Sequence, residues 1–308
     1  ADELGRDALI RRTGSAPVAS FTSTKLRWLR DAEPDAATRV AAVALPHDWL
    51  TWRLRGHGPG RADLDALTTD RSDASGTGYW SPETGEWDRE LLVAALGHDA
   101  VLPRVLSPSE RAGVTAGGAL RGGVAIGAGA GDNAGAALGL GLLDGEAVVS
   151  VGTSGTAFVR SSTSVRDAAG IVAGFASADG AWLPLVATLN AARVLDSTAG
   201  LLGVDHDELS RLALAAAPGS GGLVLQPWFE GERTPDLPDA TATLFGMTIA
   251  STTREHLARA AFEGLLCGLG EALDAVVRAT GTPVRRVVLT GGGARAAARP
   301  FGLLQGGA

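Results

Sequence analysis

Three glycine-rich segments constrain this chain more than any other feature: GAGAGDN at 127–133, VGTSGT at 151–156 and TGGGAR at 290–295. Each follows a run of small or β-branched apolar residues, which is typical of a strand. Glycine adopts left-handed backbone angles at little steric cost, so such segments are typical of turns that connect strands to helices. The pattern predicts an α/β fold in which several strands end in glycine turns.

The order of the predicted strands gives the organisation of the sheet. The runs GVAIGAG, AVVSVGT, TAFVRS, GIVAGF and AWLPLVA follow one another closely, which predicts adjacent antiparallel strands. The later segment RRVVLTGGGAR (285–295) predicts a buried strand that runs into the last glycine turn. We therefore expect a mixed sheet flanked by helices. The length of 308 residues favours two domains, with limits of 1–121 and 122–308 where the composition changes.

One helix is expected at 46–55, with Pro46 in its first turn. Leu45, Trp49, Trp52 and Leu54 have helical spacing and predict the face that packs on the domain. The tryptophans of this region, Trp28, Trp49 and Trp52, are expected to pack in a core or against another domain rather than to stack on a sugar.

The clearest helix is expected at 253–280. Its start is predicted by a capping box of Thr252 and Glu255, and its end by Gly281. An apolar stripe runs along it through Leu257, Ala261, Leu265, Leu269, Leu273 and Val276. Three interior glycines each cost about 1 kcal/mol relative to alanine in a helix, which predicts a close approach by another segment. They are Gly264, Gly268 and Gly270.

Composition limits the classes of partner. The chain is 45% hydrophobic and 20% charged, as expected for a globular protein. A net charge of −7 argues against binding nucleic acid or an anionic membrane, because those surfaces are recognised by clustered lysine and arginine. No apolar run is long enough to span a membrane. The single cysteine, Cys267, fits a reducing compartment, so we expect a cytoplasmic protein that binds small molecules.

Several common glycine motifs are excluded. A P-loop requires a lysine after its second glycine, and the only lysine is Lys25. In GAGAGD, Asp132 occupies the place of the third glycine of a dinucleotide-binding motif. In GTSGT, Thr156 replaces the last glycine of a serine-hydrolase elbow. The turns therefore serve either backbone geometry alone or an anion site, in which converging N–H groups and hydroxyls bind phosphate. Both interpretations stay open.

Asp132 precedes the apolar segment NAGAALGLGLL and has two compatible interpretations. As a helix N-cap it would contribute about 1 kcal/mol to stability and nothing to chemistry. As an ionised carboxylate at a helix N-terminus beside a phosphate-binding turn, it could accept a proton from an attacking hydroxyl. The second interpretation is the chemistry of a small-molecule kinase.

These motifs together resemble one family. The C-terminal motifs GAGAGDNAGAALGLGLL, SVGTSGTAF, FEGERTPDLP and TGGGAR are similar to those of the FGGY carbohydrate kinases. So are the earlier segments SFTSTKLRWLRDAEP, LPHDWLTWRLRG and TDRSDASGTGYW, and ATLFGMTIASTTREHLARAAFE at 242–263 follows the family pattern throughout. The N-terminal pattern departs at Ala32, where a polar residue is usual. Within the family, the motifs most resemble those of the xylulokinases.

The resemblance implies two actin-like, ribonuclease-H-like domains that close over a cleft, with the sugar between them and ATP bound mainly by the second. It implies that Asp132 is the general base for phosphorylation of D-xylulose and that Asn133 lies beside the sugar, with Mg²⁺ bridging the phosphates. The nucleotide-binding residues it implies are Gly152, Thr153, Ser154, Gly155 and Thr156 around the phosphates, and Gly291, Gly292 and Gly293 near the adenosine.

The chain also departs from the family pattern at both ends. Family members begin with a strand and a phosphate hairpin similar to D-x-G-T-S, followed by a sugar-binding segment, and this sequence has neither. Family members continue beyond the segment GGGARAAARPFGLLQGGA with a helix, a strand and another glycine turn. We therefore expect an incomplete first domain, a second domain truncated at its end, and a chain that is inactive alone.

The remaining charged motifs are expected to be structural. GERTP (231–235) predicts a turn in which Glu232 and Arg233 pair. The five histidines, His47 among them, have no ligand spacing, so no metal site is expected. The alternatives to a xylulose kinase are a kinase for another polyol, such as ribulose, glycerol or gluconate, and an actin-like nucleotide- or sugar-binding module without activity. A homodimer is left open.

Overall fold

The computed structural model describes residues 4–118 and 120–294. The chain forms two compact units, and it passes between them at residues 144/145, 159/160 and 184/185. The domain boundary expected at 121/122 stays a prediction, because units defined by contacts need not coincide with domain limits. The ends expected to be incomplete lie outside what the structure describes. Within the described residues, no helix is both long and apolar enough to cross a membrane.

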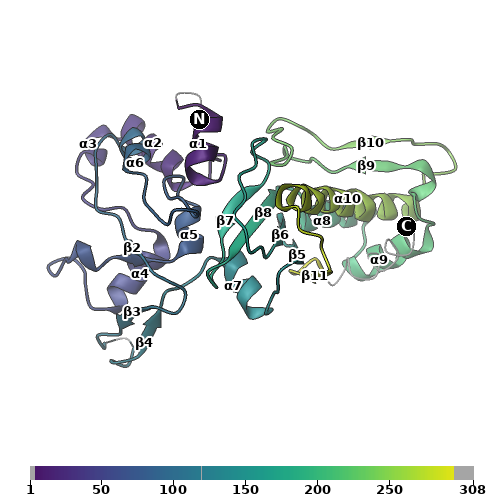
Figure 1. Ribbon diagram of the computed structural model, residues 1–308. Helices are drawn as coiled ribbons and strands as arrows, with labels where there is room; N and C mark the ends of the chain where they lie inside the picture. Colours follow the sequence, from purple (N-terminus) through teal and green to yellow (C-terminus); the bar gives the residue numbers. More distant parts are fainter. Residues whose placement is uncertain (1–3, 119, 295–308) are drawn as a thin grey trace. The chain divides into compact units, whose positions relative to one another are not determined.

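The first unit is mainly helical (Figure 1). Its helices are α1 (Arg6–Thr13), α2 (Thr22–Ala32), α3 (Pro34–Ala37), α4 (Pro46–Leu54), α5 (Arg71–Ser75), α6 (Arg89–Leu96) and α7 (Asp132–Gly139), with a 3₁₀ turn η1 (Leu64–Ala66). Its strands are β1 (Thr68–Thr69), β2 (Arg104–Val105), β3 (Arg111–Val114), β4 (Ala125–Gly127) and β7 (Ala173–Ala176). β1 pairs with β2 in parallel, and β3 pairs with β4 in an antiparallel hairpin.

One carboxylate connects two helices of this unit. Asp88 caps the N-terminus of α6 by accepting a hydrogen bond from the Leu91 N–H at 3.1 Å. The guanidinium of Arg12, at the end of α1, donates to both oxygens of the same carboxylate at 2.6 Å. A bidentate pair of this kind fixes orientation as well as distance. The largest core cluster of the unit, which includes Leu26 and Leu92, joins α1, α2 and α6.

The second unit is a sheet covered by helices. Its strands are β5 (Glu146–Val151), β6 (Gly155–Val159), β8 (Trp182–Thr188, whose first residues belong to the first unit), β9 (Val224–Gln226), β10 (Thr243–Phe245) and β11 (Arg286–Thr290). Its helices are α8 (Ala192–Leu202), α9 (His206–Ala215) and α10 (Arg254–Thr280), with a 3₁₀ turn η2 (Ser220–Gly222). The main sheet has the order β11-β5-β6-β8, and α10 packs against β5, β6, α8 and α9 (Figure 1).

The predicted strands are confirmed, with two corrections. β4, β5, β6, β7 and β8 overlap the five expected runs, and β5 pairs antiparallel with β6, as β6 does with β8. β4 was expected beside β5 but pairs with β3 in a separate hairpin. β11 begins at Arg286 as expected and pairs in parallel with β5, so the sheet is mixed. The expectation that this strand is buried is wrong, because in the described chain β11 is an edge strand in which Arg286 is exposed and the other residues are half-buried.

The helix expected at 46–55 is confirmed as α4, but its predicted apolar face is fully buried only at Trp52 and is wrong at Trp49. Asp48 and Trp52 are buried, four residues apart, whereas Trp49 is 54% exposed and its ring lies under the Arg53 guanidinium. Trp28 is 64% exposed, so it also does not pack in a core. Trp52 packs in the core as expected, and its indole N–H donates to the Asp63 carbonyl at 2.6 Å. Packing of Trp28 or Trp49 against another domain stays a prediction. A buried carboxylate rotates the helix away from the orientation that apolar residues alone predict.

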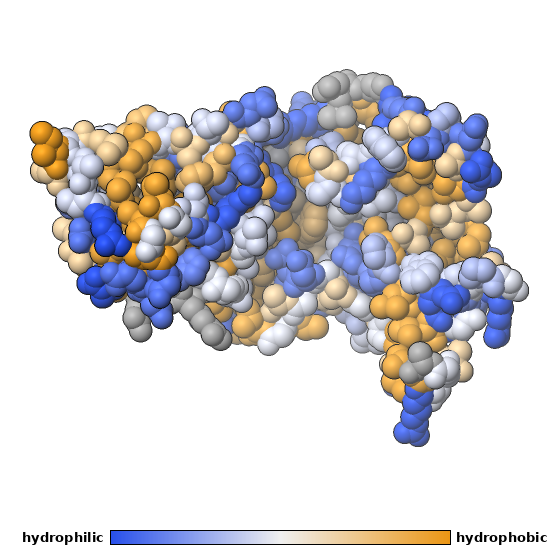
Figure 2. Space-filling model, turned by 180° about the vertical axis from the view of Figure 1, so that it is seen from behind, coloured by the Kyte–Doolittle hydropathy of each residue, from blue (hydrophilic) through white to orange (hydrophobic). Residues whose placement is uncertain are grey.

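Large apolar side chains are exposed in both units. They include Leu138 and Leu143 in the first unit and Leu201 and Ile249 in the second. On the face seen in Figure 2, apolar surface (orange) lies in patches between areas of polar surface (blue). Apolar atoms contribute much of the surface of ordinary proteins, so these residues do not by themselves define an interface.

The expected helix at 253–280 is confirmed as α10, and Gly281 ends it in the left-handed conformation, with φ 63°. The predicted capping box is wrong. Thr253 is the N-cap, and its hydroxyl accepts a hydrogen bond from the His256 N–H at 3.2 Å. The Thr252 hydroxyl instead donates to the Thr248 carbonyl at 2.6 Å. The helix therefore starts one residue later than the pattern of the box predicts.

The close approach predicted for the interior glycines of α10 is confirmed at one of them. A Cβ added to Gly264 would collide with the Leu225 carbonyl of β9, so the strand crosses the helix directly on this glycine. A Cβ added to Gly268 or Gly270 would meet no described atom within 4 Å. Gly264 is therefore a packing requirement of the fold, whereas the other two are not.

We predict opposite effects from two alanine substitutions in this helix. Gly264→Ala should lower the free energy of unfolding by about 1–3 kcal/mol, because β9 must move away. Gly268→Ala should raise it by about 0.5–1 kcal/mol, because alanine favours the helical backbone and the site is open. Chemical denaturation of the two variants and the parent measures both changes. Equal effects of the two substitutions would contradict the packing role of Gly264.

Candidate functional site

Two glycine turns of the second unit meet at one edge of its sheet. β5 and β11 run in parallel with Ser150 opposite Thr290, so the turns that follow both strands leave the sheet at the same edge. The Gly293 N–H donates to the Val151 carbonyl at 2.9 Å and fixes the second turn on the end of β5. The carboxyl ends of neighbouring parallel strands are where α/β sheets commonly bind ligands.

A cavity of about 660 Å³ lies at this edge. Gly152 and Thr153 of one turn and Gly292 and Gly293 of the other line it. The remaining lining residues come from α8 and α9: Ala192, Leu195, Asp196, His206, Asp207 and Ser210. Its size is in the range of small-molecule and cofactor sites. The sequence predicted that both turns contribute to one site, and the fold brings them to one cavity.

The N-termini of two helices contribute to the cavity wall. α8 begins at Ala192, whose N–H donates to the Gly152 carbonyl at 2.9 Å, and α9 begins at His206. Both residues line the cavity. Unpaired N–H groups and the helix dipole favour negative charge at such positions. The Nε2 atom of His206 lies 3.0 Å from a carboxylate oxygen of Asp196 within the lining.

Three of the glycines in these turns are required by packing. Gly291 has φ 94°, and a Cβ there would lie 2.6 Å from the Val151 carbonyl. A Cβ on Gly293 would lie 2.7 Å from the Val151 side chain, and one on Gly155 would lie 2.5 Å from Leu269 of α10. Gly292 differs, because a Cβ there would meet no described atom within 4 Å. Of the last turn, Gly292 alone has a space beside it that packing does not explain.

Thr153 and Ser154 are exposed between β5 and β6, while Thr156 already belongs to β6, opposite Ser150. Of the five residues predicted to surround phosphates, Gly152 and Thr153 line the cavity. Gly155 is buried against the core beneath the turn. The cavity therefore supports the first part of the predicted phosphate turn more strongly than the second.

Glu232 of the GERTP segment supports the chain just before α8. It is buried and accepts hydrogen bonds from the Asn190 side-chain amide at 3.0 Å and from the N–H groups of Leu189 and Asn190. The expected turn is confirmed, but the expected pairing of Glu232 with the side chain of Arg233 is wrong. Glu232 accepts from the backbone N–H of Arg233 at 2.7 Å, and no ion pair with its guanidinium is found among the described residues. Burial explains this, because backbone donors can satisfy a carboxylate where a guanidinium does not reach.

Asp132 is the first residue of α7 in the first unit, and it is exposed. Its Oδ1 accepts a hydrogen bond from the N–H of Asn133 at 2.7 Å. The N-cap residue is Gly131, so the N-cap interpretation of Asp132 is wrong by one position. The carboxylate of Asp132 thus lies at the helix N-terminus, as expected. An N-cap role does not account for the presence of an aspartate at this position.

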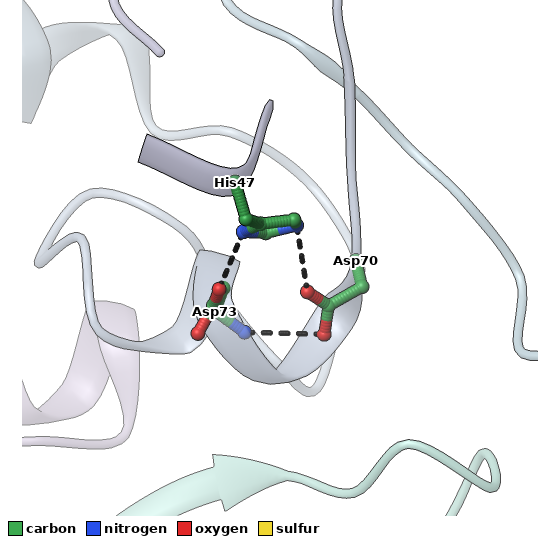
Figure 3. A group of neighbouring side chains, drawn as sticks. All are labelled: His47, Asp70 and Asp73. Carbon is green, nitrogen blue, oxygen red and sulfur yellow. Dashed lines mark hydrogen bonds and ion pairs between the residues drawn. The ribbon is translucent and has the colours of Figure 1, made fainter. Parts of the chain in front are cut away.

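Sequence reasoning missed a cluster of His47, Asp70 and Asp73 (Figure 3). It packs against the turn at 129–131 that precedes Asp132. His47 of α4 has its Nδ1 2.6 Å from an oxygen of Asp73, and its Nε2 lies 3.3 Å from Asp70 and 3.2 Å from Asp48. Asp70 caps α5 by accepting from the Ser72 N–H at 2.7 Å. Asp70, Ser72 and Asp73 all belong to the quoted segment TDRSD, whose spacing fits a helix cap.

The cluster combines carboxylates with one imidazole, and the pKa values of His47 and Asp48 are both shifted. Burial alone would lower the pKa of His47, but the contact with Asp73 and the charges of Asp48 and Asp70 outweigh it and raise that pKa above its ordinary value. Burial raises the pKa of Asp48, which is 1% exposed, to about 6. His47, Asp70 and Asp73 each offer an atom within 4.8 Å of the others, so this group could also hold a cation.

We predict that Asp48 makes stability depend on pH in an unusual direction. Its pKa is about 6 in the folded state against 3.8 ordinarily, so the folded state binds the proton more tightly. The contribution of this proton binding to the free energy of unfolding is therefore full at low pH and is lost as pH rises from about 4 through about 6. The asparagine of Asp48→Asn stays neutral at every pH. The free energy of unfolding of this variant, relative to that of the parent, should therefore rise by on the order of 1–3 kcal/mol from about pH 4.5 to about pH 7.5. Denaturation of both proteins at the two pH values measures this.

The exposed Asp65 of η1 supplies the matched control, because Asp65→Asn removes one carboxylate without burial. This variant should differ from the parent by the same amount at both pH values. A difference between Asp48→Asn and the parent that does not change with pH would contradict the role of burial at Asp48.

Comparisons with known proteins agree with this architecture. The N-terminal domain model of the FGGY family of carbohydrate kinases matches residues 1–139, and the C-terminal domain model matches residues 147–298. The xylulose kinase of Streptomyces coelicolor is 46% identical over 96% of this chain and 59% of its own length. The glycerol kinase of Alkalilimnicola ehrlichii is 34% identical over 94% of this chain and 60% of its own length.

A solved structure shows the same fold. The crystal structure of xylulose kinase from Bifidobacterium adolescentis matches with a TM-score of 0.84 and 45% identity, covering 96% of this chain and 62% of that one. The chain thus spans about three fifths of the length of the relatives it matches. The expected mixed-sheet fold of actin-like, ribonuclease-H-like sugar kinases is confirmed. The chain belongs to the FGGY family of carbohydrate kinases.

Proposed function

We propose that the protein carrying this chain is an ATP-dependent sugar kinase that converts D-xylulose to D-xylulose 5-phosphate. The observation that carries the proposal is the cavity at the joint edge of β5 and β11, where two glycine turns and two helix N-termini meet. Such an edge suits a phosphorylated nucleotide, because N–H groups provide donors for phosphate oxygens. The relatives named xylulose kinase, at 44% and 46% identity, support the choice of sugar.

Within this proposal, the second unit binds ATP together with its Mg²⁺, which enters as part of the substrate. Gly152, Thr153 and Ser154 offer backbone and hydroxyl donors to the phosphates, and Gly155 and Thr156 continue that turn. Gly292 leaves room for the nucleoside, while Gly291 and Gly293 hold the turn against β5. The carboxylates of Asp196 and Asp207 suit hydroxyl groups rather than phosphates, which supports placing the phosphates on the Thr153 side of the cavity.

Asp132 is proposed to be the general base and Asn133 to lie beside the sugar. The carboxylate of Asp132 accepts the proton of the primary hydroxyl on C5 of the sugar. As this proton leaves, the hydroxyl oxygen forms a bond to the γ-phosphorus of ATP. The bond between that phosphorus and the bridging oxygen breaks, and ADP leaves with the electron pair. Most of the rate enhancement comes from positioning and from neutralising charge on the phosphates. Exposure of Asp132 at a helix N-terminus supports this role.

Release of ADP in a coupled assay tests the proposal and its sugar. D-xylulose, L-ribulose, glycerol and gluconate are supplied in turn to the complete protein that carries these residues. Turnover with D-xylulose at the highest kcat/KM is expected. A preference for glycerol would favour the second candidate, to which the similarity of the glycerol kinases points. Binding of ATP without turnover on any of the four would leave only a binding module.

We predict that Asp132→Asn lowers kcat by at least about 10²-fold, because an amide cannot accept the proton. Binding of ATP and the melting temperature should change little, since the side chain is exposed and caps no other turn. Asp65→Asn, which removes an exposed carboxylate elsewhere in the first unit, should keep the parent kcat. Ordinary turnover by a folded Asp132→Asn protein would remove Asp132 from the reaction.

We predict a separate effect on the nucleotide from Gly292→Val. A Cβ at this position meets no described atom within 4 Å, so stability should stay close to that of the parent. It would occupy space in the cavity, and ATP binding measured by calorimetry should weaken by about tenfold or more. Gly268→Ala, placed on α10 away from the cavity lining, should bind ATP as the parent does. Parent-like affinity in Gly292→Val would place the nucleotide elsewhere.

A further inference from the structure

The turn that carries Asp132 rests on side chains from elsewhere in the first unit. The Gly131 N–H donates to the Ser72 hydroxyl at 2.9 Å. The Ser72 hydroxyl in turn donates to Oδ1 of Asp70. Since Gly131 is the N-cap residue of α7, this chain of hydrogen bonds ends one residue before Asp132. The backbone that orients the proposed base is therefore tied to a buried carboxylate.

Packing allows the turn little freedom against the same cluster. A Cβ on Gly131 would lie 2.7 Å from Oδ1 of Asp73, and one on Gly129 would lie 3.2 Å from the imidazole ring of His47. Gly129 also has φ 94°, which other residues rarely adopt. The glycines of GAGAGDN thus let the chain pass directly over His47 and Asp73. A shift of either side chain toward the turn would therefore displace the turn.

His47 holds the two carboxylates of this support together. Its two ring nitrogens face different carboxylates, Nδ1 facing Asp73 and Nε2 facing Asp70 and Asp48 (Figure 3). A neutral imidazole has only one N–H, so its other nitrogen would direct a lone pair at carboxylate oxygens. Only the imidazolium form carries a proton on both nitrogens, so that neither nitrogen directs a lone pair at a carboxylate. It also supplies the positive charge that three neighbouring carboxylates require.

We propose that His47 is a positioning residue for Asp132: as an imidazolium it joins Asp70 to Asp73 and, through Ser72, fixes the backbone of Gly131. This inference rests on the proposed function, because it assigns Asp132 as the base. The titratable groups facing His47 are Asp48 on its own helix and Asp70 and Asp73 at the start of α5. The segment 129–131, which packs over the ring, brings no titratable side chain.

The kinetic test compares His47→Gln with His47→Lys across pH 6 to 9.5 in the complete protein, with Mg²⁺-ATP and D-xylulose. His47→Gln should lower kcat by about 10- to 100-fold with KM for ATP within about twofold, because misplacement affects the transition state. His47→Lys restores the cation and should regain most of the activity. His98→Gln is the matched control, since His98 contacts the Val40 carbonyl instead.

The pH profiles separate positioning from a merely structural role. In the parent, kcat should fall as pH rises through the pKa of His47, which lies above its ordinary value, because the neutral ring releases one carboxylate. In His47→Lys this fall should move up by about 2 pH units or more, since lysine stays charged. Parent-like kcat in His47→Gln, or the same alkaline fall in the parent and His47→Lys, would overturn the proposal.

A readout that does not depend on activity is the exchange of the Gly131 amide hydrogen with solvent. It should be about tenfold faster or more in His47→Gln than in the parent and His98→Gln, because its acceptor is no longer held. Unchanged exchange would overturn the inference even if activity fell. If His47→Gln does not fold, the same question is tested by a pH titration of the parent followed by NMR. The chemical shift of the Gly131 amide should then change with the same midpoint as the signals of the His47 ring. Different midpoints would overturn the coupling.

Failure of the proposed role of Asp132 and binding of a cation by the cluster would have different consequences for this inference. If Asp132→Asn retains full activity, the proposed function of Asp132 fails, while the exchange of Gly131 still decides whether His47 holds the turn. If calorimetry with zinc or manganese detects one bound ion in the parent and none in His47→Gln, the group of His47, Asp70 and Asp73 is a cation site, and the imidazolium role is overturned. No His47-dependent ion binding is the expected result.

Discussion

The parallel pairing of β11 with β5 is the constraint on which the second unit depends. The two strands are far apart in sequence, yet Thr290 lies opposite Ser150, so the turns that follow them open at the same edge. A shift of one residue would exchange the two faces of β11 and would withdraw Gly293 from the Val151 carbonyl. The cavity, the placement of α8 and the proposed nucleotide site all follow from this register.

The sequence predicted the elements well where one pattern dominated. The apolar runs located β5, β6, β8 and β11, and the long stripe located α10, because periodicity over many residues outweighs local exceptions. It failed where one polar residue decided the geometry. Buried Asp48 orients α4, which left Trp49 exposed, and Thr253 rather than Thr252 caps α10. Such choices depend on burial and on individual hydrogen bonds, which a pattern of apolar residues does not encode.

Some parts of the candidate site were likewise predictable from the sequence, and others were not. Local motifs identified Asp132 and the two cavity turns, because each is a short segment with its own chemistry. The support beneath Asp132 could not be found by spacing, since His47, Asp70 and Gly131 come from three segments that meet only in the folded chain. The available signal was the cap pattern of TDRSD, which marks Asp70 as buried against a helix start. The glycines likewise divide into those that packing requires, such as Gly291, and one that it does not, Gly292.

Glu232 gives the cavity wall a property that surface charges lack. Its buried carboxylate is held by backbone and amide donors around Asn190, just before α8, so dissolved ions cannot readily compete for it. Arg193 of the same helix pairs instead with Glu230, which is largely exposed, and that attraction is screened by salt. Rising ionic strength should therefore weaken the Arg193–Glu230 pair at the start of α8, while the hydrogen bonds of Glu232 just before that helix persist. The wall of the cavity should accordingly keep its position in concentrated salt.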